Sequence, residues 1–357
     1  MASFLNFIKS SLSEDSKRKI WSWLELFDRK VAFLVHRSRF LSRVRYCLKP
    51  GGFGDEFYAL QNGIVKYYTG LKLVKHTHAL LRRNTHRLEK GLVMRPRRDV
   101  FAVDFINETV DLYRALLTSL DEPNEEIFWA HDVLNEYFSV VNIEDNVSVQ
   151  AAYEKFRQHP VDKKDAIKRA PFLRKKGPTI TYEQFLDLCR YRRSVRWFLQ
   201  KPVPRTLLDQ AFAAAALSPT ACNRQSYSFR VLDDPELIAK ASVIPGGAGG
   251  FNHNMPVYIV VTGKLRSYVK SYDRHAIYID SSLAVMAFVF CLETLGLASC
   301  IINWGDHPKK NKRMSKLLNL EDDERVITTI AVGYPDPTGL VPFSTKKEIE
   351  YLRSYNK

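Results

Sequence analysis

The residues best suited to chemistry lie in the second half of the chain. The segment Arg192-Arg193-Ser194-Val195-Arg196 places three guanidinium groups and a hydroxyl within five residues. Arginine forms bidentate, charge-assisted hydrogen bonds, so this cluster suits a phosphate group. Taken alone, it has an equally simple alternative, because arginine clusters are common on solvated surfaces.

A polar loop, residues 218–225, joins an alanine-rich helical stretch at 205–217 to a strand-like run at 228–232. Its sequence, SPTACNRQ, offers backbone N–H groups and short side chains as donors and acceptors. These groups suit the polar edge of a flavin ring. The alternative is an ordinary connection between a helix and a strand.

Two further segments follow in the same half. The apolar run after Asp280-Ser281-Ser282 predicts a buried helix with Asp280 or a serine as its N-cap, ending at Gly296. The next strand ends at Ile302-Asn303-Trp304-Gly305, and a last strand runs into Gly333-Tyr334-Pro335. The basic segment 342–347 comes after it. Taken alone, the helix indicates core and the basic segment a solvated tail.

In this order and spacing, the four segments resemble the nitroreductase family over about residues 179–357. The resemblance implies an α+β fold with a mixed or antiparallel sheet wrapped by helices, preceded here by an all-helical N-terminal domain. It implies FMN as cofactor, NAD(P)H as electron donor and a homodimer with FMN at the interface. The expected activity is that of an NAD(P)H:acceptor oxidoreductase whose chemistry resides in the flavin, so no catalytic side chain is assigned.

The resemblance also implies which positions contact FMN. The first segment and the basic tail bind its phosphate and ribityl chain, the polar loop reaches the ring of the partner's flavin, and the end of the strand after the long helix lies over the ring. The glycine loop 245–250 occupies a place where family members commonly bring an asparagine to the flavin. The expected residues are Arg192, Arg193, Ser194, Arg196, Pro219, Thr220, Ala221, Asn223, Gln225, Gly246, Gly247, Ile302, Asn303, Trp304, Gly305, Ser344, Lys346 and Lys347.

Some positions depart from the family pattern. Ser226-Tyr227 stands where members often have Pro-Trp, and Trp304 replaces a residue that is usually small, which predicts narrower access to the flavin. The helical lid found in many members is missing before Asp280, so substrate selection is assigned to the N-terminal half. The glycine loop is no dinucleotide fingerprint, because it precedes a strand instead of following one.

The hydrophobic periodicity divides the chain into three parts. Residues 1–157 are predicted to form a helical domain, and the charged, proline-containing stretch 158–178 is predicted to be a linker. In residues 179–357, strands are predicted at 228–232, 257–262, 298–303 and 326–332, and helices at 182–191, 205–217, 234–242, 280–295 and 309–319.

The positive charge is concentrated at the start of the chain. Residues 1–100 hold 21 Lys and Arg against 8 Asp and Glu, whereas 101–150 hold 1 against 11. A basic segment with interleaved aromatic residues, within 1–50, suits a peripheral contact with anionic lipid, but it also suits pairing with the acidic stretch or simple solvation. Nucleic acid is not the expected partner. A second functional hypothesis therefore makes the protein an accessory subunit, with or without flavin, held at a membrane surface or in a complex by these helices.

Other patterns limit the protein class. No apolar run long enough for a membrane span and no secretory signal are found, and the five cysteines lack metal spacing. A cytoplasmic location, with or without membrane association, is therefore expected. The segment Thr85–Gly91, THRLEKG, puts His86 and Glu89 on one helix face near His76 and His78. Too few carboxylates accompany them for a diiron bundle, so a helix-end or interdomain contact is the preferred interpretation and no metal is expected.

Overall fold

The computed structural model describes residues 13–48, 53–70, 78–163, 165–174 and 177–356. The chain divides into two compact units, residues 1–58 and 59–357. His76, one of the two histidines noted near the THRLEKG segment, lies outside the described residues. The predicted linker, 158–178, falls within the second unit and stays a prediction.

The first unit consists of helices. Helices α2 (Glu14–Val35) and α3 (Arg39–Leu48) precede α4 (Gly54–Gly70), which crosses into the second unit. An ion pair of 2.7 Å between Arg45 and Asp28 links α3 to α2. None of the described side chains in residues 13–48 is buried. Large apolar side chains such as Trp23 and Phe33 are instead more than 60% exposed.

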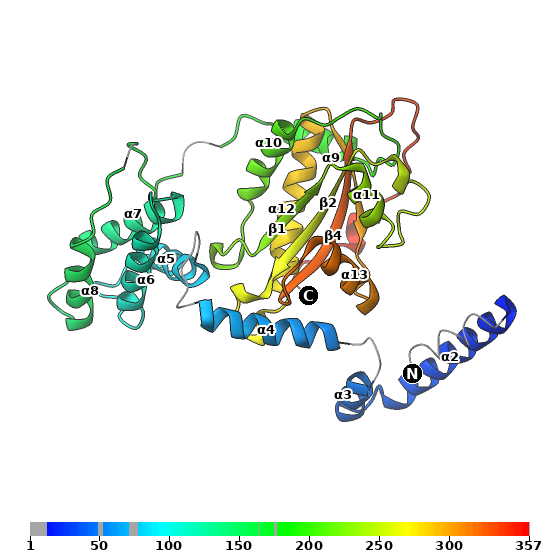
Figure 1. Cartoon of the computed structure of the whole chain (residues 1–357). Helices are drawn as coiled ribbons and strands as arrows, with labels where there is room; N and C mark the ends of the chain where they lie inside the picture. The colour runs from blue at the N-terminus through cyan, green and yellow to red at the C-terminus, as the bar shows by residue number, and fades with distance from the viewer. Residues whose placement is uncertain (1–12, 49–52, 71–77, 164, 175–176, 357) are drawn as a thin grey trace. The chain divides into compact units, whose positions relative to one another are not determined.

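The second unit begins with a helical part that has its own core. Helices α5 (Ala79–Leu92), α6 (Ile106–Ser119), α7 (Glu125–Val140) and α8 (Val147–Arg157) pack through fully buried side chains. The side chains of Asn124 and Asn146 accept hydrogen bonds from the first turns of α7 and α8, which fixes where these helices begin. The all-helical character predicted for this part is confirmed (Figure 1).

A four-stranded antiparallel sheet forms the centre of the C-terminal part. Strands β1 (Tyr227–Leu232), β2 (Val257–Lys264), β3 (Ala298–Asn303) and β4 (Glu324–Gly333) lie in the order β1-β2-β4-β3. Each coincides within two residues with a predicted strand. The predicted α+β class is confirmed, and of the two sheet types expected the antiparallel one is observed.

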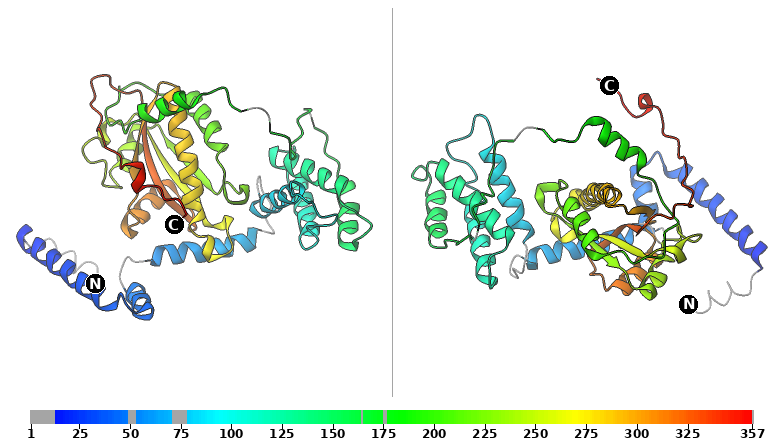
Figure 2. Two further views of the ribbon diagram at one scale, coloured as in Figure 1. Left: turned by 180° about the vertical axis from the view of Figure 1, so that it is seen from behind. Right: turned by 90° about the horizontal axis from the view of Figure 1, so that it is seen from above.

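Helices cover both faces of this sheet. Alternate residues of β2 point to opposite sides: Val257, Ile259 and Val261 pack with α10 (Arg205–Ala216) and α12 (Ala276–Thr294). Tyr258 and Val260 pack with buried residues of α11 (Pro235–Ser242) and α13 (Pro308–Leu318). Figures 1 and 2 show the helices around the sheet. Because both faces are covered, β2 is apolar along nearly its whole length. Helix α9 (Tyr182–Tyr191) comes before α10 in the sequence. Short 3-10 turns lie at Ala221–Asn223, Asn252–Asn254, Leu265–Ser267, Ser271–Asp273 and Ile349–Tyr351.

The long helix α12 is the central core helix. By length and composition alone, the segment Ser271–Thr294 is long and apolar enough to cross a membrane. Its inner face, however, packs on the sheet and on α10, where Ala284, Phe288 and Leu292 are fully buried. The helix ends as predicted at Gly296, whose φ of +72° allows Leu297 N–H to bond back to the carbonyl of Leu292.

The predicted N-cap of this helix is wrong. Helix α12 begins at Ala276, so Asp280 lies one turn inside it and is 3% exposed. Its carboxylate accepts hydrogen bonds from the Tyr268 hydroxyl at 2.6 Å and from the Ala221 backbone N–H at 3.1 Å. A buried carboxylate needs such partners, and Asp280 therefore holds a distant loop instead of a helix end.

Candidate functional site

A cavity of about 300 Å³ lies beside β3, at the edge of the sheet. It brings together five residues that the sequence segments predicted, from three separate parts of the chain: Arg196, Gly247, Ile302, Asn303 and Gly305. Five more lining residues were missed: Pro245, Phe251, Cys300, Ile301 and Lys310.

Arg196 reaches this cavity because the segment before it joins the sheet edge. The Val195 N–H donates to the carbonyl of Ser299 in β3 at 3.0 Å. The carbonyl of Arg196 accepts from Asn254 Nδ2 at 3.0 Å, and its guanidinium carbon lies 5.7 Å from the centre of the Phe251 ring. Asn254 itself accepts from Gln200 at 2.7 Å. Contacts therefore hold both the backbone and the side chain of Arg196.

The glycine loop forms another wall of the cavity. Gly246 has a φ of +80°, which side-chain-bearing residues rarely adopt. Lys310, near the start of α13, donates from Nζ to the carbonyl of Pro245 at 2.6 Å and so joins the loop to that helix. Gly247 faces Ile302, whose Cγ2 would lie 3.6 Å from an added Cβ. Glycine is thus favoured at position 246 by its backbone conformation, whereas a Cβ at position 247 would meet β3 at an ordinary van der Waals distance.

The cavity is electropositive. Arg196 and Lys310 line it, and no acidic side chain is among its described lining residues. Cys300 is buried in its wall, and this burial raises the pKa of the thiol, opposed by the nearby Arg196 and by a hydrogen bond with Ser194. The thiol is therefore neutral near pH 7. An anionic group with an apolar body fits such a lining.

The remaining arginines of the first segment do not line this cavity. Arg193 donates to the carbonyl of Phe343 at 3.0 Å, which brings the C-terminal segment with Ser344 beside the arginine cluster. Lys346 and Lys347, further along the segment, are exposed. The Nε of Arg192 is buried without a hydrogen-bond partner among the described residues, as is Oε1 of Glu293. Burial raises the pKa of Glu293 to about 7, and Arg192 opposes this rise.

The polar loop lies elsewhere in the same chain. It leads into β1, whereas the cavity lies at β3, and these strands form opposite edges of the sheet. With three strand spacings of about 4.8 Å between them, the two sets are separated by roughly 14 Å or more. One protomer therefore does not bring Pro219, Thr220, Ala221, Asn223 and Gln225 to the cavity.

Trp304 is placed differently from the prediction. The side chain is 7% exposed and belongs to the core cluster under the sheet, where its Nε1 donates to Asn311 at 3.0 Å. Its neighbours Asn303 and Gly305 line the cavity, but Trp304 does not. The expected narrowing of access by this indole is therefore not observed.

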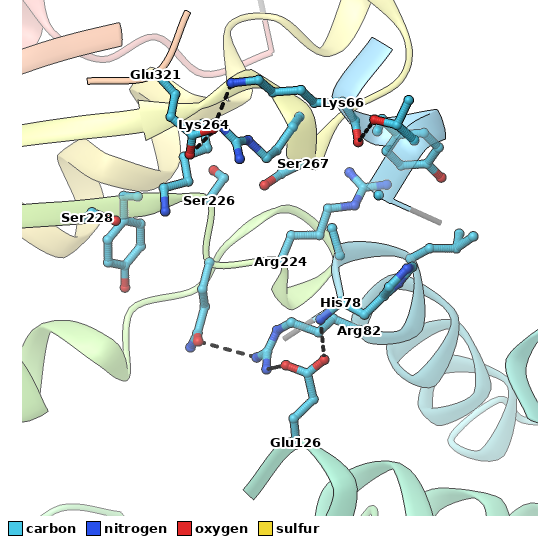
Figure 3. A pocket seen from close by; sticks show the side chains of 18 of the residues that line it. Lys66, His78, Arg82, Glu126, Arg224, Ser226, Ser228, Lys264, Ser267 and Glu321 are labelled. Carbon is cyan, nitrogen blue, oxygen red and sulfur yellow. Dashed lines mark hydrogen bonds and ion pairs between the residues drawn. The ribbon is translucent and has the colours of Figure 1, made fainter. Parts of the chain in front are cut away.

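A second, larger cavity of about 1020 Å³ lies next to the polar loop. Arg224, Gln225 and Tyr227 form one side, and α4 and α5 contribute Lys66 and Arg82 to the other. Figure 3 shows the ion pair of Arg82 with Glu126 at one end and that of Lys66 with Glu321 at the other. The helical part thus lines a cavity together with the loop.

The conspicuous THRLEKG segment is a structural part of α5. Glu89 accepts a hydrogen bond from Trp129 Nε1 at 3.0 Å and lies 3.3 Å from His86 Nδ1, while Leu88 is fully buried. Gly91 is inside the helix and makes room for the ring of Phe101. Among the described residues, no group of three or more His, Cys, Asp and Glu is arranged to hold a metal ion. These bonds lie within α5 and between α5 and α7, so they are contacts inside the helical part and not between domains.

The C-terminal part of this chain is similar to known proteins. Residues 189–246 and 244–334 match the sequence profile of the Nitroreductase family, as predicted for this part.

Individual relatives are distant. Iodotyrosine deiodinase 1 of Pongo abelii is 22% identical over 200 residues, which cover 47% of this chain and 67% of the relative. Iodotyrosine deiodinase of Haliscomenobacter hydrossis is 23% identical over 198 residues, 47% of this chain and 85% of the relative. An FMN-dependent nitroreductase from Clostridium difficile R20291, of known structure, is 23% identical with a TM-score of 0.42, and the match covers 48% of this chain and 99% of that one.

Proposed function

We propose that this protein is an FMN-dependent oxidoreductase that takes electrons from NAD(P)H and delivers them to a small-molecule acceptor. The observation that carries the proposal is the electropositive cavity beside β3, where Arg196, the glycine loop and the end of β3 meet. These elements are distant in sequence, and the nitroreductase-family match spans them. When bound, FMN supplies the electron carrier, while the protein binds and orients it.

The residues of the cavity fit this cofactor. Arg196 and Lys310 provide positive charge for a phosphate, and Arg193, three residues before Arg196, bonds the C-terminal segment at Phe343, next to Ser344 in sequence. The apolar side chains of Phe251 and Ile302 offer a surface for a planar ring. The loop contributes Pro245 and Gly247 to the lining, and the positive φ of Gly246 between them favours glycine. A single protomer supplies only this half of the expected contacts.

A homodimer would complete the site. The polar loop lies at the opposite edge of the sheet, so a second copy is needed to bring its residues to the first copy's flavin. The C-terminal part also exposes large apolar side chains, including Tyr182 of α9, Ile279 of α12 and Phe343, each more than half exposed. Apolar surface of this kind marks interaction sites.

The larger cavity is the proposed route for the acceptor. It borders Gln225 of the polar loop and is lined by the helical part, which fits the expectation that the N-terminal half selects the substrate. The two curated relatives described above are named iodotyrosine deiodinases. We therefore propose an acceptor whose reducible group is a ring substituent.

A direct test is the colour of the purified protein. We expect visible absorption bands of bound flavin and release of FMN on denaturation. Titration of the apoprotein with FMN should reach one FMN per chain. Under anaerobic conditions, NADH or NADPH should bleach the visible absorption of the bound flavin. A colourless protein that binds no added FMN would overturn the proposal.

A second function has its own supporting observation. The helices of the first unit expose Trp23, Phe27, Phe33 and Leu34, in a segment rich in Lys and Arg. Aromatic and basic residues together favour the surface of anionic membranes. We therefore also propose peripheral membrane attachment, tested by flotation with vesicles of phosphatidylserine and phosphatidylcholine. Binding that is lost in Trp23→Glu, Phe27→Glu would support it, and equal recovery with and without vesicles would exclude it.

A further inference from the structure

The polar loop is held in an unfavourable backbone conformation. Cys222, Asn223 and Gln225 have φ values of +53°, +51° and +49°. Residues with a Cβ avoid this region, because the Cβ crowds the following carbonyl oxygen. Three such residues within four positions persist only where the surroundings hold them. The loop therefore depends on its contacts.

Part of the support comes from the C-terminal part itself. Asp280 accepts from the N–H of Ala221 at 3.1 Å, and Thr220 Oγ1 accepts from the N–H of Gln225 at 3.1 Å. The Gln225 side chain donates from Nε2 to the carbonyl of Ala216 at 3.2 Å. These bonds secure both ends of the loop. The carbonyl of Asn223, at its centre, points to another partner.

That partner is Arg82 of α5, from the helical part. Its Nε donates to the carbonyl of Asn223 at 2.8 Å, and its Nη2 donates to Oε1 of Gln225 at 3.3 Å. The bonds join residues 141 and 143 positions apart in sequence. One guanidinium group thus contacts two of the three strained residues, using the fork geometry that lysine lacks.

Arg82 is itself firmly positioned. Its Nη1 donates to Glu126 Oε2 at 2.9 Å, and the side chains are 13% and 5% exposed respectively. Glu126 also accepts from the N–H of His78 at 2.9 Å, so it ties the start of α5 to α7. The guanidinium carbon lies 5.2 Å from the centre of the Trp129 ring. The arginine therefore joins the loop to the helical part, and Figure 3 shows it bonded to Glu126.

We propose that the helical part serves flavin binding, with Arg82 as the residue that positions the polar loop for the flavin of the partner protomer. The proposal rests on the proposed function for its cofactor and its dimer. The loop conformation itself is a property of this chain, and it can be measured without flavin. Arg82 is a positioning residue, because the proposal has it act through the loop, which it contacts at Asn223 and Gln225.

The experiment compares Arg82→Ala with a matched control, Arg169→Ala. Arg169 is also 13% exposed, pairs with Glu125 and Asp165, and lies 5.1 Å over an aromatic ring, that of Phe128. It makes the same kinds of contact without a described bond to the loop. Both variants are measured by hydrogen exchange of peptides spanning residues 217–228, in the apoprotein, and by titration with FMN.

We expect faster exchange at the amides of Ala221 and Gln225 in Arg82→Ala, and an FMN dissociation constant raised by about tenfold, as loss of charge-assisted hydrogen bonds implies. Arg169→Ala should stay within about twofold of wild type in both. Arg82→Lys, which keeps the charge, covers the case that the alanine variant does not fold, and it should show intermediate exchange.

The outcomes separate the two proposals. Unchanged exchange of the loop in folded Arg82→Ala or Arg82→Lys would overturn the positioning role. Equal weakening of FMN binding in the Arg82 and Arg169 variants would also overturn it, since the effect would then be general destabilisation. Wild-type protein that binds no FMN would refute the proposed function, and the exchange data would still decide whether Arg82 orders the loop.

Discussion

At the scale of single residues, the arginine cluster carries the clearest prediction. We expect Arg193→Ala, Arg196→Ala to abolish FMN retention during purification. Arg196 lines the electropositive cavity, and Arg193 bonds the carbonyl of Phe343, so the double variant loses positive charge and the bond to the C-terminal segment. Each lost charge-assisted bond to a phosphate is worth about 1.5–3 kcal/mol.

The FMN content is measured by absorbance after gel filtration. Arg205→Ala is the control, because that arginine belongs to the same domain but is exposed and pairs only with Asp233 among the contacts described for it. Flavin content equal to wild type in the double variant would show that the phosphate site lies elsewhere.

Glu293 predicts a pH dependence of stability. Its pKa is raised from 4.5 to about 7 in the folded chain, mainly by burial and against the influence of Arg192. The unfolded chain releases this proton first as pH rises, so the contribution of Glu293 to stability falls between about pH 4.5 and 7 and stays low above. Glu293→Gln removes this loss and should raise the free energy of unfolding at pH 8 by on the order of 1 kcal/mol, discounted for partial exposure.

Thermal unfolding of wild type and Glu293→Gln from pH 5 to 8 measures the effect. The midpoint temperature of the variant should exceed that of wild type by about 2–4 °C at pH 8. The variant and wild type should converge near pH 5. Parallel curves across the range would exclude Glu293 as the titrating group.

At the scale of elements, Gly91 lies inside α5 at a position that has no room for a side chain. An added Cβ would overlap the ring of Phe101, which itself packs edge-on against Tyr137 with ring centres 4.9 Å apart. We expect Gly91→Ala to destabilise the second unit by about 1–3 kcal/mol through overpacking, in spite of the better helix propensity of alanine.

Urea unfolding followed by circular dichroism checks the sign. Gly70→Ala, at the end of α4, is the matched control because nothing lies within 4 Å of its added Cβ. A stabilised Gly91→Ala would mean that Phe101 moves aside at no cost.

The elements of the C-terminal part were largely predictable from sequence. Alternating or continuous apolar runs mark β1 to β4, and strong breaks such as Gly296 mark their boundaries. Asp280 was misjudged because a carboxylate before an apolar helix has the pattern of an N-cap. Its actual partners, Tyr268 and Ala221, are brought to it only by the fold. No local signal distinguishes a capping carboxylate from a buried one.

The candidate site was predicted in part for the same reason. Arg196 and Asn303 belong to recognisable segments, whereas Lys310 comes from a run of lysines in which no single one stands out. Arg82 stands just before the conspicuous THRLEKG segment, and its partner Asn223 is 141 positions away. Contacts at such distances follow from tertiary structure and leave no trace in composition or periodicity.

At the scale of the whole molecule, the helical part and the sheet domain belong to one compact unit. Helix α4 approaches the end of β2 so closely that a Cβ at Gly63 would overlap Leu265. Lys66 of the same helix forms an ion pair of 2.9 Å with the buried Asp323, and Arg82 bonds the polar loop. The sequence predicted a domain boundary at the charged, proline-containing stretch 158–178, whereas the contacts divide the chain after residue 58. The contacts just described join the helical part to the sheet domain, and this explains the difference.

Assembly gives the last prediction, because the proposed site needs two copies. In a homodimer built this way, each flavin site combines the cavity of one protomer with the polar loop of its partner. An Arg196→Ala chain has a damaged cavity and an intact loop, whereas an Asn223→Pro chain has the reverse. Each variant alone should bind FMN poorly at both sites. A mixed dimer, however, pairs the intact cavity of one chain with the intact loop of the other, so one of its two sites is restored.

Unfolding the two variants together and refolding them at equal concentrations makes about half of the dimers mixed, and FMN binding should recover to about a quarter of all sites. Titration with FMN and multi-angle light scattering measure occupancy and mass on the same sample. Refolding each variant separately, followed by mixing, provides the control. If co-refolded dimers form but FMN binding does not recover, the cavity and the polar loop do not combine across the dimer, and the shared site is wrong. A monomeric wild-type protein that binds one FMN per chain would also refute the shared site.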